Sequence, residues 1–376
     1  MTGNRPIRVA HLIDTGGPGG AETVFLTLAA RDAAKSRDAA IVVPYDGWLA
    51  ARLRDAGLRP VVLASRGSFN LCFLGSLIRL LRNRDATLLQ SHLIGSSVYG
   101  ALAGWWCRTP VVAVFHGATD LASPGRLLWL KRWLILRPHV CIVAVSEAVM
   151  SALATWGIPE TRIRLVRNGV DTAAFSPGHS DLASRELNLP ASARIIGAVG
   201  NLRAPKAYEI LIRAARFVFK HRPDTHVAVF GAGSEADHAT LLALAGELGI
   251  SKHVHLRGFL PASAELYRSF DVFSSSARSE GLPLSFLEAM ACGIPIAATD
   301  NEGSGPLLRE TGAGLLSPVD DPQALANNLV RLLDDRKLAG RLAAAGRQAA
   351  CDRFSLDATL AQYDAMYAAL METGGR

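Results

Sequence analysis

Short apolar runs rich in β-branched residues recur along the first half of the chain, and segments with helical spacing separate them. The runs predict strands at 7–13, 40–43, 60–63, 86–91, 111–115 and 140–145, with a helix over about 21–33 after the first strand. Strands that are apolar on both faces and alternate with helices are typical of a parallel sheet covered on each side. The first half therefore predicts a doubly wound α/β domain.

The same alternation restarts after a polar stretch at 176–181 that is marked by proline and glycine. Further strands are expected at 195–199, 226–230, 253–256, 272–274, 295–298 and 314–316, with a helix over about 208–220 and a last helix over about 356–370. Open parallel sheets bind ligands outside the carboxyl ends of their strands. The chain therefore predicts two domains, 1–180 and 181–355, whose carboxyl-end loops face one another across a cleft.

The chain has 376 residues, of which 49% are hydrophobic and 19% charged, and this indicates an ordered protein large enough for two domains. Its five cysteines are widely spaced and form no Cys-x-x-Cys pair. This spacing argues against a disulfide framework or a zinc site and fits a reducing cytosol. No signal peptide is expected. The uncharged stretch 86–107 predicts a buried strand and a helix of small residues rather than a membrane span.

Charge is distributed unevenly between the two halves. Residues 1–190 hold 21 Lys+Arg and 13 Asp+Glu, a net charge of +8, and the remaining residues hold 19 and 20, a net charge of −1. The basic first half suggests an anionic surface or acceptor, whereas nucleic acid is disfavoured because no basic run or aromatic RNA-binding motif is present. The segment 125–137 combines tryptophan with arginine and lysine. It predicts either a helix at a membrane surface or a core-packed helix with a basic edge.

Two glutamates eight residues apart, Glu280 and Glu288, flank the start of an apolar helix in which Pro283 suits the first turn. The start of a helix offers free backbone N–H groups to a phosphate, and an ionised carboxylate accepts a pair of sugar hydroxyls. This segment could therefore grip both ends of a nucleotide sugar. The plainer alternative is a solvated Glu280 and a capping box between Ser285 and Glu288.

One glycine motif could indicate a dinucleotide cofactor. Gly231 and Gly233 follow a predicted strand and fit the pattern Gly-x-Gly-x-x-Ala. A dinucleotide site would also need an acidic residue at the end of the next strand, and the sequence His253 to Arg257 has none there. A nicotinamide or flavin enzyme is therefore disfavoured.

Several motifs share the order and spacing of one known family. They are Gly16 to Glu22, Phe115 to Gly117, Val145 to Val149, Val166 to Asp171, Val199 to Lys206 and Ser279 to Pro295. Together they resemble the retaining family-4 glycosyltransferases over nearly the whole chain, in particular bacterial enzymes of polysaccharide biosynthesis. The resemblance implies the GT-B fold, with two Rossmann-like domains and a C-terminal helix, 356–376, that packs back on the first domain.

The resemblance also implies roles for individual side chains. In the second domain Glu288 would bind the ribose and Glu280 the sugar hydroxyls of a UDP- or GDP-linked donor. Arg203 and Lys206 would stabilise the departing diphosphate, a task that positive side chains can perform without a metal. His116 would hydrogen-bond the donor sugar from the first domain, and no side chain is assigned as a nucleophile.

Backbone groups complete the implied donor site. They belong to Gly281, Leu282, Pro283 and Leu284, which would seat the sugar, to Gly231 and Gly233 beside the nucleotide, and to Gly16 and Gly17 near the donor phosphates or the acceptor. The chain departs from the family pattern at Asn201, Ala207 and the segment 301–306. These departures leave the local contacts open.

The resemblance thus implies a retaining glycosyltransferase of the hexosyltransferase type that uses no metal or other cofactor. The absence of an Asp-x-Asp motif is consistent with a metal-independent enzyme. The expected acceptor is a glycan or a polyprenyl-linked glycan, met at an anionic membrane surface. The protein would then be cytoplasmic and peripheral on the inner face of the plasma membrane. Two alternatives stay open: a nucleotide-sugar epimerase that hydrolyses its donor, and a catalytically silent sugar-nucleotide-binding protein.

Overall fold

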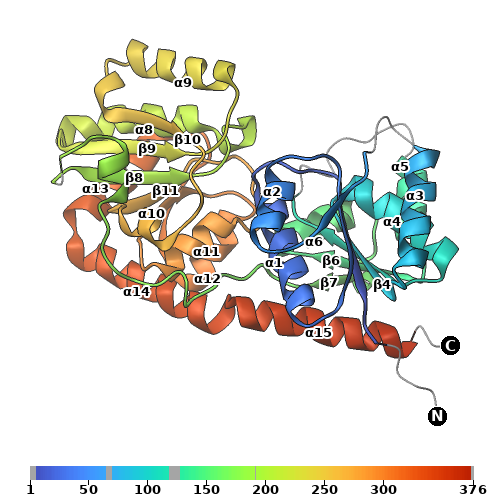
Figure 1. Ribbon diagram of the computed structural model, residues 1–376. Helices are drawn as coiled ribbons and strands as arrows, with labels where there is room; N and C mark the ends of the chain where they lie inside the picture. Colours follow the sequence, from blue (N-terminus) through green and yellow to red (C-terminus); the bar gives the residue numbers. More distant parts are fainter. Residues whose placement is uncertain (1–5, 65–69, 118–127, 191, 374–376) are drawn as a thin grey trace. The chain divides into compact units, whose positions relative to one another are not determined.

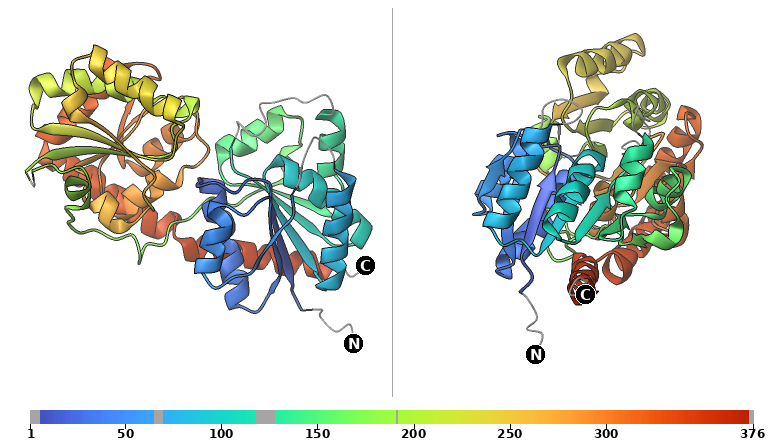
Figure 2. Two further views of the ribbon diagram at one scale, coloured as in Figure 1. Left: turned by 45° about the horizontal axis from the view of Figure 1, so that its top comes forward. Right: turned by 90° about the vertical axis from the view of Figure 1, so that its right-hand side faces the viewer.

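The computed structural model describes residues 6–64, 70–117, 128–190 and 192–373. The chain forms two compact units, of which the first comprises Met1–Asn168 with Thr359–Arg376 and the second comprises Gly169–Ala358. Each unit is built on a parallel sheet with helices on both faces (Figures 1 and 2). The prediction of two doubly wound, Rossmann-like domains is therefore confirmed.

The sheet of the first unit has the order β3-β2-β1-β4-β5-β6-β7, and its neighbouring strands are parallel. The strands are β1 (Val9–Ile13), β2 (Asp38–Val43), β3 (Pro60–Val62), β4 (Leu88–His92), β5 (Val111–Phe115), β6 (Val140–Ala144) and β7 (Ile163–Leu165). The helices are α1 (Gly20–Ala34), α2 (Trp48–Asp55), α3 (Leu71–Asn83), α4 (Ile94–Cys107), α5 (Leu128–Ile135), α6 (Glu147–Thr155) and η2 (Glu160–Arg162). The strand order reverses at β1, which is the doubly wound arrangement.

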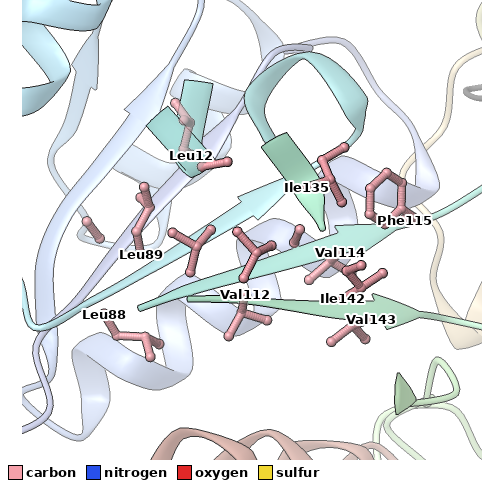
Figure 3. Packing of buried hydrophobic residues seen from close by; sticks show 14 of the residues in the cluster. Leu12, Leu88, Leu89, Val112, Val114, Phe115, Ile135, Ile142 and Val143 are labelled. Atoms are coloured by element: carbon pink, nitrogen blue, oxygen red, sulfur yellow. The ribbon is translucent and has the colours of Figure 1, made fainter. Parts of the chain in front are cut away.

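The core of the first unit lies around its central strands. All residues of β4 and β5 are buried, and Figure 3 shows Leu89, Val112 and Ile142 packed together from β4, β5 and β6. In β4 the second half, Gln90 to His92, is polar although buried. Most positions of a central strand are nonetheless apolar, because the strand is covered on both faces. This is why uninterrupted apolar runs in the sequence located these strands.

One strand of this sheet escaped the sequence analysis. β7 has only three residues, and Arg164 at its centre is exposed. It pairs with β6 alone and lies at the edge of the sheet. A short edge strand with one solvated face has neither the length nor the apolar run of the central strands, and this is why no pattern predicted it.

The second unit has the strand order β10-β9-β8-β11-β12-β13, again with parallel neighbours. The strands are β8 (Arg194–Val199), β9 (Thr225–Phe230), β10 (Val254–Gly258), β11 (Val272–Ser275), β12 (Ile296–Thr299) and β13 (Gly314–Ser317). The helices are α7 (Leu182–Glu186), η3 (Ala204–Lys206), α8 (Tyr208–His221), α9 (Glu235–Glu247), η4 (Ser251–His253), α10 (Ala264–Arg268), α11 (Leu284–Ala291), α12 (Ser304–Thr311), α13 (Pro322–Asp334) and α14 (Arg336–Arg353).

Alternate residues of strand β9 belong to two different hydrophobic clusters. Ala228 and Phe230 of β9 belong to a cluster with residues of α11 and α14, whereas Val227 and Val229 belong to a cluster with residues of α8 and α13. Successive side chains of a strand point to opposite faces, so this division shows that each face carries its own helix layer. The sheet is buried on both sides, as its apolar sequence requires.

The boundary between the units falls between Asn168 and Gly169 rather than at 180/181. The reason is that residues 170–176 are bonded to the second unit. The N–H of Val170 donates to the carbonyl of Phe354 at 2.8 Å, and the guanidinium of Arg347 donates to the carbonyls of Thr172 and Phe175. The polar stretch 176–181 that suggested a linker therefore lies inside the second unit.

The last helix, α15 (Leu356–Thr373), starts in the second unit, and its residues from Thr359 onward belong to the first. Tyr363, Met366 and Tyr367 are buried in the core of the first unit. On the outer side of the helix, Asp364 forms ion pairs with Arg31, Lys35 and Arg37. The helix is therefore held to the first unit by both apolar packing and charge.

The uncharged stretch 86–107 forms strand β4 and helix α4. Within residues 6–64, 70–117, 128–190 and 192–373, no helix combines the length and the apolar content needed to cross a bilayer.

The loops that follow β8 and β9 touch through a glycine, and this contact generates a stability prediction. A Cβ atom on Gly231 would lie 1.9 Å from the carbonyl oxygen of Gly200, which is a backbone atom. Because the two backbones must separate to admit a methyl group, we expect Gly231→Ala to destabilise the second unit by about 3 kcal/mol. Its thermal midpoint should fall by roughly 10 °C, measured by differential scanning calorimetry.

The matched control is Gly340→Ala in helix α14, where a Cβ atom would meet nothing within 4 Å. A glycine-to-alanine change inside a helix stabilises by about 0.5–1 kcal/mol. The control midpoint should therefore stay level or rise slightly. Equal midpoints for Gly231→Ala and the parent protein would show that the contact does not constrain the loops.

Candidate functional site

Two loops of the second unit are joined at the carboxyl edge of its sheet. The hydroxyl of Ser276, after β11, donates to the carbonyls of Lys206 and Ala207, at 3.1 and 2.8 Å. The N–H of Arg278 donates to the carbonyl of Pro205 at 2.8 Å. These bonds hold the turn after β8 against the segment that leads to α11, although the two are about 70 residues apart in sequence.

The joined loops bring Lys206 and Glu280 into contact. The Nζ of Lys206 lies 2.5 Å from Oε1 of Glu280, and the two side chains are 23% and 10% exposed. A charge-assisted bond in such a half-buried place is stronger than a surface pair. Arg203 lies exposed on the same loop, three residues before Lys206. Two of the implied phosphate- and sugar-binding residues are therefore partners of each other in the ligand-free protein.

The departure at Ala207 has a structural consequence. Ala207 adopts φ +47° and ψ +46°, which is the left-handed region. Glycine enters this region freely, whereas an alanine there costs roughly 1 kcal/mol. The turn that presents Lys206 is therefore kept in a left-handed conformation by the surrounding hydrogen bonds, despite the side chain at this position.

Glu288 occupies a different environment from Glu280. It is buried on α11, and the hydroxyl of Tyr267 donates to its Oε2 at 2.5 Å. Burial raises the pKa of Glu288 to about 7, although the bond from Tyr267 works in the opposite direction. A buried carboxylate with a perturbed pKa is typical of a functional site.

The start of α11 differs slightly from the prediction. The helix begins at Leu284, and Pro283 precedes it in an extended conformation with φ −71° and ψ 127°. Ser285 therefore lies within the helix and cannot act as its N-cap, which rules out the capping box with Glu288. Leu282 and Pro283 are buried, whereas Gly281 and Leu284 are partly exposed, so this segment offers backbone groups at the surface of the loop.

The segment after β12 supports the Glu280 loop through hydrogen bonds and close packing. The side-chain amide of Asn301 donates to the carbonyl of Ala277 at 2.8 Å, and its oxygen accepts from the N–H groups of Gly303 and Ser304. A Cβ atom at Gly303 would lie 2.2 Å from the carbonyl oxygen of Gly281. Asn301 and Gly303, which depart from the family pattern, are thus structural supports for the loop that carries Glu280.

Gly231 and Gly233 serve the packing of this region. Besides the contact of Gly231 with Gly200, a Cβ atom on Gly233 would lie 2.7 Å from the side chain of Leu202. The N–H of Leu202 donates to the carbonyl of Ala232 at 2.7 Å. The need for glycine here comes from the chain's own close approach, which is a sufficient reason without a ligand.

The glycine loop of the first unit contains two different positions. A Cβ atom on Gly16 would meet the ring of Tyr45 at 3.1 Å, and the carbonyl of Gly16 accepts from the N–H of Leu49. A Cβ atom on Gly17 would meet nothing within 4 Å. Of these two glycines, Gly17 is therefore the one open to the close approach of a ligand, and Gly16 is a packing residue.

His116 follows β5 and is bonded to His92 at the end of β4. The Nδ1 of His92 lies 2.9 Å from Nε2 of His116, and the two rings are within 16° of parallel. Burial lowers the pKa of His116 to about 3 and that of His92 well below its usual value. Both imidazoles are therefore neutral near pH 7. Ser146 caps helix α6 by accepting from the N–H of Val149, which is a structural role.

The described residues contain no group of three or more His, Cys, Asp or Glu side chains that could hold a metal ion. The histidines of β9 and β10 do lie together, with Nδ1 of His226 3.1 Å from Nε2 of His255, but carboxylate ligands are not part of that group.

Sequence reasoning missed the residues that support the site. They are Tyr267, Arg278, Asn301 and Gly303 in the second unit, with Gln90 and Tyr367 in the first. Most of them are single residues far along the chain from the groups they touch, so no spacing marks them. Gln90 is the exception, because a glutamine two positions before a histidine in an apolar strand is itself a signal of a buried polar contact.

Two family models match the chain in succession. Residues 18–174 match the model described as Glycosyltransferase Family 4, and residues 180–349 match the one described as Glycosyl transferases group 1. The first match covers most of the first unit and the second covers most of the second unit, and the break between them lies at 174–180, inside the second unit.

Curated relatives include the D-inositol 3-phosphate glycosyltransferase of Thermobispora bispora. It is 36% identical over 306 residues, which are 76% of this chain and 71% of the relative. The protein of the same name from Salinispora tropica is 37% identical over 303 residues, which are 73% of this chain and 62% of the relative. The alignment thus spans about two thirds of the length of these relatives.

Solved structures share the fold at lower sequence identity. Anabaena HepE in complex with UDP-glucose has a TM-score of 0.86 at 21% identity and covers 96% of this chain and 100% of its own. A glycosyltransferase from Rickettsia africae has a TM-score of 0.86 at 18% identity and covers 98% of this chain and 99% of its own. With the family models and the relatives, these similarities show that the chain belongs to the family-4 glycosyltransferases, which have the GT-B fold.

Proposed function

We propose that this chain is a retaining, metal-independent glycosyltransferase that moves a hexose from a nucleotide sugar to an acceptor. The observation that carries the proposal is the arrangement in the second unit. Lys206 and Glu280 form an ion pair at the carboxyl edge of the sheet, and the buried carboxylate of Glu288 lies on the helix that starts four residues after Glu280. Positive charge, a helix start and two carboxylates together suit a diphosphate that links a ribose to a sugar.

Each residue then has a distinct task. Lys206, with Arg203 on the same loop, neutralises the negative charge that develops on the diphosphate when the glycosidic bond breaks. Glu288 accepts hydrogen bonds from the ribose hydroxyls, and Glu280 accepts them from the sugar. His116 of the first unit hydrogen-bonds the donor sugar. The acceptor then attacks the anomeric carbon of the sugar from the face that the diphosphate leaves, so the anomeric configuration is retained. The transition state has oxocarbenium character, and no side chain acts as a nucleophile.

Donor binding exchanges the Lys206–Glu280 ion pair for contacts of each side chain with the donor. A diphosphate offers Lys206 more negative charge than one carboxylate does, so the ammonium group moves from Glu280 to the phosphates when the donor binds. This transfer releases an acceptor oxygen of Glu280 for the sugar hydroxyls. The pair therefore keeps both side chains bonded, and their charges compensated, until the donor replaces the contact.

The similar proteins suggest which donor nucleotide and which class of acceptor to test first. HepE was solved with UDP-glucose, which supports a uridine nucleotide as the first donor to test, with GDP-sugars next. The relatives named D-inositol 3-phosphate glycosyltransferases make an anionic, phosphate-bearing acceptor a candidate, and the net charge of +8 in residues 1–190 suits it. A lipid-linked glycan phosphate, as used in cell-surface polysaccharide synthesis, is also anionic and is a second candidate acceptor, located at the membrane.

The proposal predicts a thermal shift that depends on Glu288. A donor at about a thousand times its Kd should stabilise the fold by roughly 4 kcal/mol. We expect one base among UDP-, GDP-, ADP- and dTDP-sugars to raise the melting temperature, and Glu288→Gln to reduce this rise, because a neutral amide is a weaker acceptor for the ribose hydroxyls. The measurement is differential scanning fluorimetry.

The control for that panel is Glu247→Gln, at the exposed end of α9 in the same unit. Its thermal shift should equal that of the parent protein. No shift with any nucleotide sugar would contradict the proposal. If binding is found, chromatography of the products separates transfer to an acceptor from release of the free sugar, which an epimerase or hydrolase would give.

The raised pKa of Glu288 predicts that donor binding releases a proton. In the free protein the pKa is about 7. Hydrogen bonds from ribose hydroxyls favour the ionised form and so lower this pKa. At pH 6 the group is largely protonated when free and ionised when bound. Isothermal titration calorimetry in buffers of different ionisation enthalpy should then detect a proton released at pH 6 and almost none at pH 9.

The raised pKa of Glu288 also makes the stability of the free protein depend on pH. A carboxyl group whose pKa is higher in the folded state than its ordinary 4.5 contributes stability below pH 4.5, and this contribution is lost as the pH rises through 7. Glu288→Gln removes both effects. Proton release that persists in this variant would mean that another group titrates on binding.

The membrane hypothesis has support in helix α5. Leu134 and Ile135 are buried in the core, whereas Trp129 and Trp133, one turn apart, are 65% and 49% exposed. The guanidinium of Arg137 lies 3.9 Å from the centroid of the Trp133 ring. Part of the predicted segment, residues 125–127, lies outside the described residues. The helix thus packs by one face and exposes two tryptophans, and Arg137, two residues after the helix ends, stacks on one of them. Exposed tryptophan beside arginine is the composition of an anionic membrane surface site.

Vesicle binding tests this part of the proposal. The parent protein should sediment with phosphatidylglycerol vesicles at low salt, and the double variant Trp129→Ser/Trp133→Ser should bind at least about tenfold more weakly because both apolar anchors are lost. The control, Leu242→Ser/Phe259→Ser, removes exposed apolar side chains from the second unit and should bind like the parent. A protein that ignores these vesicles and glycosylates free D-inositol 3-phosphate would contradict the membrane hypothesis.

A further inference from the structure

A row of hydrogen-bonded polar side chains runs through the core of the first unit. Gln90 and His92 occupy alternate positions of β4, so both side chains extend from the same face of the sheet. Tyr367 reaches the row from helix α15, and His116 ends it at the carboxyl end of β5. Gln90, His92 and Tyr367 are fully buried, and only His116 is partly exposed.

Consecutive hydrogen bonds connect the four side chains. The hydroxyl of Tyr367 donates to Oε1 of Gln90. The Nε2 of Gln90 lies 3.0 Å from Nε2 of His92, and Nδ1 of His92 lies 2.9 Å from Nε2 of His116. Among the described residues, none is bonded to Nδ1 of His116, so the row stops at that nitrogen.

The direction of each bond determines the next. A tyrosine hydroxyl that donates to Oε1 leaves the NH₂ group of Gln90 facing His92, so Nε2 of His92 must accept. A neutral imidazole has one donor nitrogen and one acceptor, so the proton of His92 lies on Nδ1 and is donated to Nε2 of His116. The proton of His116 then lies on its own Nδ1. The opposite orientation of the Gln90 amide would reverse every one of these assignments.

The surroundings keep both rings neutral. The edge of Phe25 packs against His92 at a centroid distance of 5.3 Å and against His11 at 5.9 Å. His11 on β1 is bonded instead to Asp32 of α1 at 3.1 Å, so that carboxylate does not reach the row. Burial lowers the pKa values of His92 and His116, so neither ring gains a second proton near pH 7.

We propose that Tyr367, Gln90 and His92 are positioning residues that hold His116 in the tautomer with Nδ1–H free to donate to a ligand oxygen. The inference rests on the proposed function, because it specifies how His116 meets the donor sugar: as a neutral hydrogen-bond donor to a hydroxyl oxygen. Stability alone does not require the row, since replacing both partners of a buried hydrogen bond by apolar groups can be nearly neutral. The row of hydrogen bonds is needed if His116, at its end, must direct Nδ1–H toward a ligand.

The tautomer itself can be measured in the ligand-free protein. We expect long-range ¹H–¹⁵N spectra of protein labelled in histidine to show His116 and His92 protonated at Nδ1, with assignments from His116→Asn and His92→Asn. In Tyr367→Phe the amide of Gln90 is free to turn, so a second set of signals protonated at Nε2 should appear. The control is Tyr363→Phe, one turn earlier on the same helix and equally buried, which removes a hydroxyl outside the row.

A His116 protonated at Nε2 in the parent, or unchanged spectra in Tyr367→Phe, would overturn the proposal. With donor present, Tyr367→Phe should lower kcat/KM for the nucleotide sugar about tenfold, while Tyr363→Phe keeps the parent value. Equal losses in the two variants would indicate a structural effect only and would also overturn it. Failure of the proposed function is separate, since it would appear as absent nucleotide-sugar binding in the parent, whatever the tautomer.

Discussion

The candidate site of the second unit depends on one constraint, the common direction of its strands. Because β8, β9, β11 and β12 are parallel, the segments that follow them leave the sheet at the same edge. Hydrogen bonds then join these segments: Ser276 to the carbonyl of Lys206, Asn301 to that of Ala277, and Leu202 to that of Ala232. Without this convergence Lys206 and Glu280 would have no reason to meet.

Close contact between these loops leaves little room for side chains. Gly231 lies against the backbone at Gly200, and Gly303 against that at Gly281, so a methyl group at either position would collide with a carbonyl. Ala207 occupies a left-handed conformation that favours glycine. The close packing therefore requires glycine at Gly231 and Gly303, whereas Ala207 accepts an unfavourable backbone conformation.

Both units bury polar groups, among them the His11–Asp32 pair of the first unit. The second unit keeps an ion pair, Lys206–Glu280, and the isolated carboxyl group of Glu288, whose raised pKa reflects the cost of burial. The first unit buries a neutral row that ends at His116, in which each side chain is bonded to the next. In the proposed function Lys206 suits the diphosphate of the donor, and the carboxylates of Glu280 and Glu288 suit hydroxyl groups.

Apolar runs in the sequence were enough to determine the fold class, the central strands and the presence of two domains, because most positions of a strand covered on both faces are apolar. Pro283 likewise indicated the start of α11, which begins at the next residue. Only the tertiary structure decided which groups meet. The partner of Glu288 is Tyr267, the row behind His116 reaches α15, and residues 170–176 belong to the second unit. Each of these contacts joins segments distant in sequence, and strand order and loop packing, which no local pattern encodes, bring them together.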